Sequence, residues 1–180
     1  MIKATLIVGT GETNIQLYNL LCLLTSFSLG AYFYTVLHKR WKKILVLIFC
    51  AANGAYYVFN NVVEDGQAVF DSLAYVILSS TLVILIFMFM HEVMSNVKEE
   101  PLSMNFDFWF VASQLLYFMG GFVIFLTYGS MTWKVLSKDA LSDYTNVLTW
   151  VWGVHNVLLF LSALITLGSI AWISYRRKLR

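Results

Sequence analysis

The chain has 180 residues, of which 59% are hydrophobic and only 12% are charged, and its formal net charge is +2. Charged residues make up about 25% of an ordinary soluble domain, so this composition excludes a soluble globular fold and indicates a membrane protein. Basic residues form no stripe of the kind that binds nucleic acid, so we expect no nucleic-acid partner. Because no Pro-rich, Gly/Ser-rich or highly charged linker divides the chain, we expect one transmembrane helical domain over residues 1–180.

Five long apolar runs follow one another along the chain. Each reaches the roughly 20 residues that a helix needs to cross about 30 Å of hydrocarbon, and none shows the alternation of a β-barrel strand. The sequence therefore predicts an all-α integral membrane bundle of five transmembrane helices, in which short links make successive helices antiparallel neighbours. The predicted spans are residues 15–37, 44–63, 70–93, 106–132 and 147–175.

Most of the basic residues fall in segments that a five-span topology places on one side of the membrane. Basic residues resist translocation, so we expect this side to be the cytoplasm, with the N-terminus outside and the C-terminus cytoplasmic. At the membrane surface these side chains can contact anionic lipid. They form two groups, namely Lys39, Arg40, Lys42 and Lys43 after the first span, and Arg176, Arg177, Lys178 and Arg180 at the C-terminal end.

Polar side chains inside the predicted spans are the best candidates for a functional site. An ionisable group at the bilayer centre costs at least about 2.5 kcal/mol on insertion scales, so such groups usually face the bundle interior or water. His155 lies about eight residues inside the fifth span, which is too deep for its side chain to reach water. The candidates for ligand binding or buried polar contacts are His155, Asn156, Trp152, Asn53, Gln114 and His91.

His155 has two interpretations. It is either a neutral histidine that forms a hydrogen bond with a neighbouring helix, or a residue with a ligand-binding, proton-relay or metal-binding role. Trp150 and Trp152 lie close to it in the sequence. They belong either to an interfacial aromatic belt or to a site for a lipid, a quinone or another apolar ligand.

Motifs for catalysis are missing from the sequence. Cys22 and Cys50 fall on different predicted helices and form no C-x-x-C pair, and neither a zinc-protease nor a serine-hydrolase motif is present. We therefore predict no catalytic residues, no metal and no resident cofactor. The alternative is a haem b site with His38 and His91 as axial ligands, because these two histidines are expected at the same level near the cytoplasmic boundary.

The C-terminal half carries several aromatic-rich stretches, which include residues 108–110, 115–118, 120–122 and 150–156. Over about residues 106–175 the chain resembles small polytopic membrane proteins of Bacteroidetes-type bacteria that are encoded beside sensor histidine kinases. The resemblance implies a sensory or accessory module of the bacterial inner membrane, with a sensor kinase as a possible partner. It implies no particular ligand and no residue roles.

Two functional hypotheses follow. The first is a non-enzymatic, multi-pass protein of the cell membrane that acts as a signalling accessory or sensory module, binding a lipophilic ligand or a membrane partner. Besides the lipid bilayer, its partners would be a second copy of the chain or another membrane protein. The second hypothesis is a small redox subunit with haem b or quinone, or a transport or channel subunit with Asn53 or Gln114 facing a pore.

Overall fold

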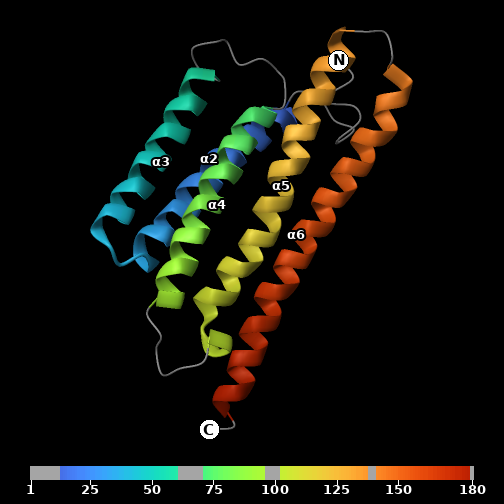
Figure 1. The fold of residues 1–180 in the computed structure, drawn as a ribbon. Coiled ribbons are helices and arrows are strands. Elements are labelled where there is room, and N and C mark those ends of the chain that lie inside the picture. Colours follow the sequence, from blue (N-terminus) through green and yellow to red (C-terminus); the bar gives the residue numbers. More distant parts are fainter. Residues whose placement is uncertain (1–12, 61–70, 96–101, 138–140, 179–180) are drawn as a thin grey trace.

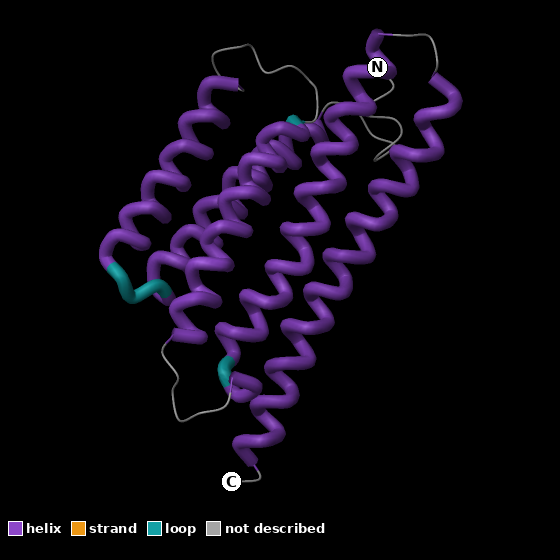
Figure 2. Tube along the Cα trace, viewed as in Figure 1, coloured by secondary structure: helices purple, strands orange, loops and turns teal. Residues whose placement is uncertain are grey.

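A computed structural model of the chain describes residues 13–60, 71–95, 102–137 and 141–178. Within these ranges the fold is entirely helical and contains no strand, which confirms the predicted all-α class (Figures 1 and 2). The elements are α2 (Thr13–Val36), α3 (Arg40–Val58), α4 (Ser72–Ser95), the short 3-10 helix η2 (Leu102–Met104), α5 (Phe106–Ser137) and α6 (Leu141–Lys178).

Four helices in the described part of the chain are long and apolar enough to cross a membrane, so the protein is a multi-pass membrane protein. Their apolar segments are Tyr18–Val36, Ser72–Ser95, Phe106–Gly129 and Thr149–Arg176. α3 is not among them, because it begins at Arg40 and so includes basic residues that the sequence placed in a link before the second span. The backbone N–H groups of Lys42 and Lys43 donate to the carbonyl of Lys39 and start the helix there.

α5 and α6 continue beyond the spans predicted for them. α5 extends to Ser137 and α6 already begins at Leu141, so most of the segment between the predicted spans 106–132 and 147–175 is helical. At 1.5 Å per residue, the 32 residues of α5 reach about 48 Å, well beyond the roughly 30 Å of the hydrocarbon. Hydrophobicity marks where a helix leaves the bilayer, whereas the helix itself ends only where its hydrogen-bonding pattern stops.

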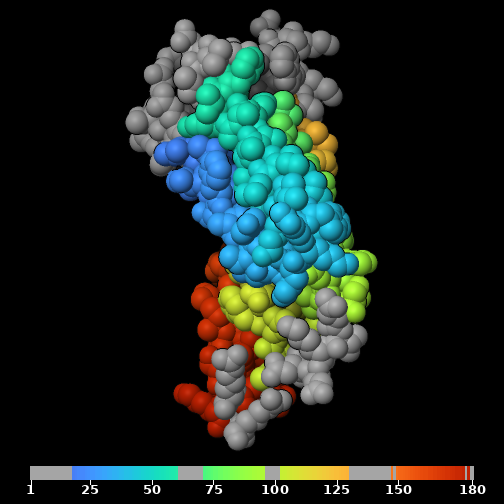
Figure 3. All heavy atoms as spheres, turned by 90° about the vertical axis from the view of Figure 1, so that its left-hand side faces the viewer, coloured from blue at the N-terminus to red at the C-terminus, as the bar shows by residue number. Residues whose placement is uncertain are grey.

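The helices form an up-and-down bundle in which α5 lies between α4 and α6 (Figure 1). The core is built around α4, which contributes the largest share of its buried side chains, and α2, α3 and α5 pack onto it; its fully buried side chains include Phe33, Val46, Leu85, Ile86 and Val111. α3 and α6 lie on opposite sides of the bundle (Figure 1). Figure 3 shows α3 beside α2, with the start of α5 and the end of α6 projecting below them. α6 therefore forms one edge of the bundle.

Glycine allows close helix contacts at two places. A Cβ atom at Gly30 of α2 would lie 2.2 Å from the Cys50 Sγ atom of α3, and a Cβ at Gly120 of α5 would lie 2.2 Å from the Leu158 Cδ1 atom of α6. Lipid supplies no hydrophobic drive for helix association, so close backbone packing of this kind is a main source of attraction between helices. These two glycines serve packing within the chain.

Candidate functional site

His155 faces the interior of the bundle from α6. Its side chain is only 7% exposed, and its Nε2 atom lies 3.3 Å from the hydroxyl oxygen of Tyr117 on α5. The Trp152 ring stacks on the imidazole at a centroid distance of 5.1 Å, and the Phe125 ring meets it edge-on at the same distance. The hydrogen bond to a neighbouring helix, one of the two predicted interpretations, is therefore present.

The aromatic contacts around His155 extend to two further helices. Phe125 packs against Tyr75 of α4 at 4.6 Å, and Trp152 meets Tyr18 of α2 edge-on at 6.0 Å. The Tyr75 hydroxyl also donates to the Tyr18 carbonyl at 2.8 Å. We refer to these six residues, Tyr18, Tyr75, Tyr117, Phe125, Trp152 and His155, as the aromatic cluster. It joins α2, α4, α5 and α6 around one imidazole.

The second ring nitrogen of His155 is left without a hydrogen bond. Its Nδ1 atom is buried and has no hydrogen-bonding partner among the described residues. A neutral imidazole carries one N–H and one bare nitrogen, so if the Tyr117 hydroxyl donates to Nε2, Nδ1 carries the proton and is a donor. Because a buried polar atom without a partner costs about 1–3 kcal/mol, the cluster favours any group that supplies a hydrogen-bonding partner for Nδ1, an acceptor in this tautomer.

The other predicted site residues do not join this cluster. Asn156 and His91, which were candidates for buried polar contacts, are instead exposed. Asn156 follows the buried His155, and His91 precedes the buried Glu92. Because adjacent helix residues point about 100° apart, a neighbour of a buried residue can face outward. Asn53 donates to the carbonyl of Phe49 in its own helix, and the half-buried Gln114 donates to the hydroxyl of its neighbour Ser113. Of the six candidates, the structure brings together Trp152 and His155.

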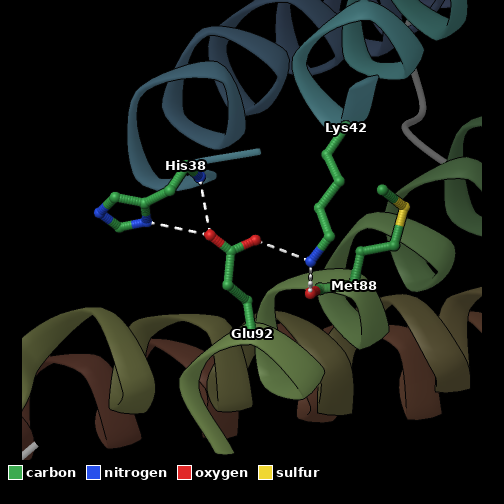
Figure 4. A network of polar contacts seen from close by, with 4 residues as sticks. All are labelled: His38, Lys42, Met88 and Glu92. Atoms are coloured by element: carbon green, nitrogen blue, oxygen red, sulfur yellow. Dashed lines mark hydrogen bonds and ion pairs between the residues drawn. The ribbon is translucent and has the colours of Figure 1, made fainter. Parts of the chain in front are cut away.

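A second polar site, which was not predicted from the sequence, lies near the α2–α3 turn (Figure 4). The Lys42 ammonium nitrogen of α3 lies 2.7 Å from Glu92 Oε2 of α4 and donates to the Met88 carbonyl at 2.8 Å. The other carboxylate oxygen of Glu92 accepts the backbone N–H of His38 at 2.9 Å and lies 3.1 Å from His38 Nδ1. We call His38, Lys42 and Glu92 the ion-pair site.

Lys42, one of the basic residues predicted at the membrane surface, is buried inside the bundle. The Lys42 side chain is only 4% exposed, because the first turn of α3 directs it onto α4. The described members of the basic group otherwise lie at the surface, where Lys39, Arg40, Arg176 and Lys178 are exposed. Lys43 lies over the Tyr34 ring, and Arg180 and the Arg177 side chain are outside the described residues.

The two histidines considered as haem ligands occupy different environments. The His38 imidazole is 79% exposed and its Nδ1 atom contacts Glu92. His91, one residue before Glu92, is exposed, whereas the Glu92 side chain points into the bundle. The ring nitrogen of His38 that faces the protein is thus already engaged by a carboxylate.

At the opposite end of these helices, Asp71 connects three of them. Its Oδ1 atom accepts the Ala74 backbone N–H at 2.9 Å, so Asp71 caps the start of α4. The same atom accepts the Tyr56 hydroxyl at 3.2 Å, and the second carboxylate oxygen accepts the side-chain amide of Asn60. The Asp71 backbone N–H donates to Asn19 of α2 at 3.4 Å. One carboxylate therefore fixes α3 and α4, and its residue also reaches α2.

Fold and site together define an all-helical, multi-pass membrane protein with a buried histidine in an aromatic cluster and an ion-pair site between two of its helices. Comparisons with models of protein families, with curated proteins and with solved structures find no match to this chain.

Proposed function

We propose that the protein is a non-enzymatic sensory or accessory module of a bacterial inner membrane, which binds a lipophilic ligand at the aromatic cluster. The observation that carries the proposal is the buried Nδ1 atom of His155, which has no hydrogen-bonding partner in the described structure. It lies among aromatic rings from several helices, in a surrounding that suits an apolar molecule with one polar group.

The membrane arrangement that goes with this proposal has five spans, with α3 as the additional one. The charges of α3 support a fifth span. Lys42 is paired with Glu92, and the other basic residues in the first turn of α3 lie at the end of that helix. The α2–α3 turn and the C-terminal end of α6 lie at the same end of the bundle (Figure 1). The excess of basic residues at that end favours a cytoplasmic location for it.

The ligand that fits best is an apolar molecule with a carbonyl or hydroxyl oxygen. When Tyr117 donates to Nε2, the Nδ1–H group of His155 can donate to such an oxygen, while Trp152 and Phe125 provide apolar contact. A ligand that bridges α5 and α6 would bind more tightly in one arrangement of these helices than in another. That difference in affinity is what couples binding to a signal.

The test is to purify the protein in nanodiscs formed directly from native membranes and to identify bound small molecules by mass spectrometry. We expect one lipophilic molecule to be retained by the wild type and to fall at least about tenfold in His155→Phe, which keeps an aromatic ring but removes both nitrogens. His91→Phe is the matched control, because it makes the same change at an exposed position of α4.

The functional arm of the test is rescue of a gene deletion. The His91→Phe copy should restore the wild-type phenotype and the His155→Phe copy should not. The proposal fails if no molecule is retained by the wild type, or if His155→Phe retains it and rescues the deletion as fully as His91→Phe does.

A further inference from the structure

The side of α6 that faces away from α5 forms a continuous exposed surface. Gly153, Asn156, Val157, Phe160, Leu164 and Leu167 are all exposed, and their spacing of one, three or four residues places them on one side of the helix. The opposite side carries the buried residues His155, Ser162, Ser169 and Ile173. We call the first set the outer α6 face. In a bilayer, this face meets either lipid or another protein.

Asn156 is the one polar side chain of the outer α6 face. It lies inside the apolar segment Thr149–Arg176, and it forms no hydrogen bond with any residue that the structure describes. A primary amide has two donor hydrogens and an acceptor oxygen, none of which hydrocarbon can satisfy. Contact with lipid alone would therefore leave a carboxamide unsatisfied within the span.

Gly153 lies one turn before Asn156 on the same face, and packing within the chain does not require it. A Cβ atom added at Gly153 would meet nothing within 4 Å, whereas one at Gly120 would collide with Leu158. Glycine costs about 1 kcal/mol relative to alanine inside a helix. At Gly153 the missing side chain gives access to the backbone from outside the bundle, as at the interfaces of paired membrane helices.

We infer that the outer α6 face binds the same face of a second copy of the chain, with the two Asn156 amides hydrogen-bonded across a two-fold axis. An amide is complementary to itself, because each copy can donate to the carbonyl oxygen of the other. The face carries no charge, so identical copies do not repel each other. Copies inserted with the same topology are related by an axis normal to the membrane, which brings the same residue of each copy together.

The inference is independent of the proposed ligand. Asn156 is not part of the aromatic cluster, whose central residue His155 faces α5, on the opposite side of α6 from Phe160 and Leu164. Loss of the dimer would leave the His155 site intact within one chain, and loss of the ligand would leave the outer face unchanged. The two ideas can therefore fail separately.

The experiment is disulfide cross-linking in native membranes, with Cys22 and Cys50 replaced. We expect Phe160→Cys, one turn from Asn156 and 62% exposed, to form disulfide-linked dimers at least about tenfold more than Met119→Cys. Met119, 50% exposed, is the matched control on α5. It adjoins Gly120, which faces Leu158, and therefore lies near the level of Phe160 on the antiparallel helix.

Two further variants separate the amide from general packing. Asn156→Leu should lower the Phe160→Cys dimer about tenfold, and Asn156→Gln, which retains an amide, should preserve most of it. Equal cross-linking at Phe160→Cys and Met119→Cys, linkage to a different protein, or a dimer unchanged by Asn156→Leu would each overturn the inference. Because Asn156 is exposed and forms no hydrogen bond within the described residues, these variants should reach wild-type levels in the membrane.

Discussion

Replacing Glu92 with alanine is expected to lower the free energy of unfolding by about 3–5 kcal/mol, because it leaves the buried Lys42 ammonium without its counter-charge. Both side chains are nearly inaccessible, at 4% and 6% exposure, so water cannot take over the role of the carboxylate. The measurement is unfolding of the purified protein in mixed micelles with increasing SDS, followed by circular dichroism. An unfolding free energy within about 1 kcal/mol of wild type would contradict the role of the ion-pair site.

The control removes both charges at once. A Lys42→Met, Glu92→Leu double variant should recover most of the stability lost in Glu92→Ala, because an apolar pair of similar volume has no desolvation cost. Stability that stays as low in the double variant as in Glu92→Ala would show that packing, rather than an unpaired charge, causes the loss. The two variants together therefore identify the physical origin of the effect.

Asp71→Ala should have the second largest effect, a loss of roughly 2 kcal/mol. The substitution removes the cap of α4, typically about 1 kcal/mol, together with the acceptor for Tyr56 of α3 and for Asn60, which follows α3. The same SDS titration measures the loss. Hydrogen exchange should in addition become faster at the start of α4, beginning with the backbone amide of Ala74, which loses its hydrogen bond to the Asp71 carboxylate.

Asn105 provides the matched comparison for Asp71. Its side-chain oxygen accepts the Phe108 backbone N–H at 3.2 Å, so it caps α5 in the same manner, but no bond from its side chain to another helix is present in the described structure. Asn105→Ala should therefore cost only about 1 kcal/mol. Equal losses for the two variants would mean that the bonds from Asp71 to α3 add nothing to stability.

The sequence predicted the helices well because each property that defines them is local. Apolar length identified the segments around α2, α4, α5 and α6, and these are the helices long and apolar enough to span a membrane. α3 begins at Arg40, four residues before the span that was predicted from Ile44. Hydrophobicity identifies the apolar part of a helix. The first turn of α3 is charged, so hydrophobicity did not indicate that it is helical.

The candidate site was predicted in part. His155 was singled out because it lies deep in the fifth predicted span, and Trp152 because it is close to His155 in the sequence. The structure places their rings in contact. Tyr117 and Phe125 were not singled out, because in a chain with 17% aromatic residues only the rotation of α5 selects which rings face the histidine. The pairing of Lys42 with Glu92 was missed for the same reason, since it depends on how α3 and α4 face each other.

The ion-pair site also constrains the order in which the protein can be assembled. Lys42 lies in the first turn of α3, whereas its counter-charge, Glu92, is synthesised 50 residues later and lies near the end of α4. An α3 that entered the bilayer alone would bring an unneutralised ammonium with it. In the proposed arrangement with α3 as a fifth span, α3 and α4 would therefore reach their final depth in the membrane together, as one unit during biogenesis.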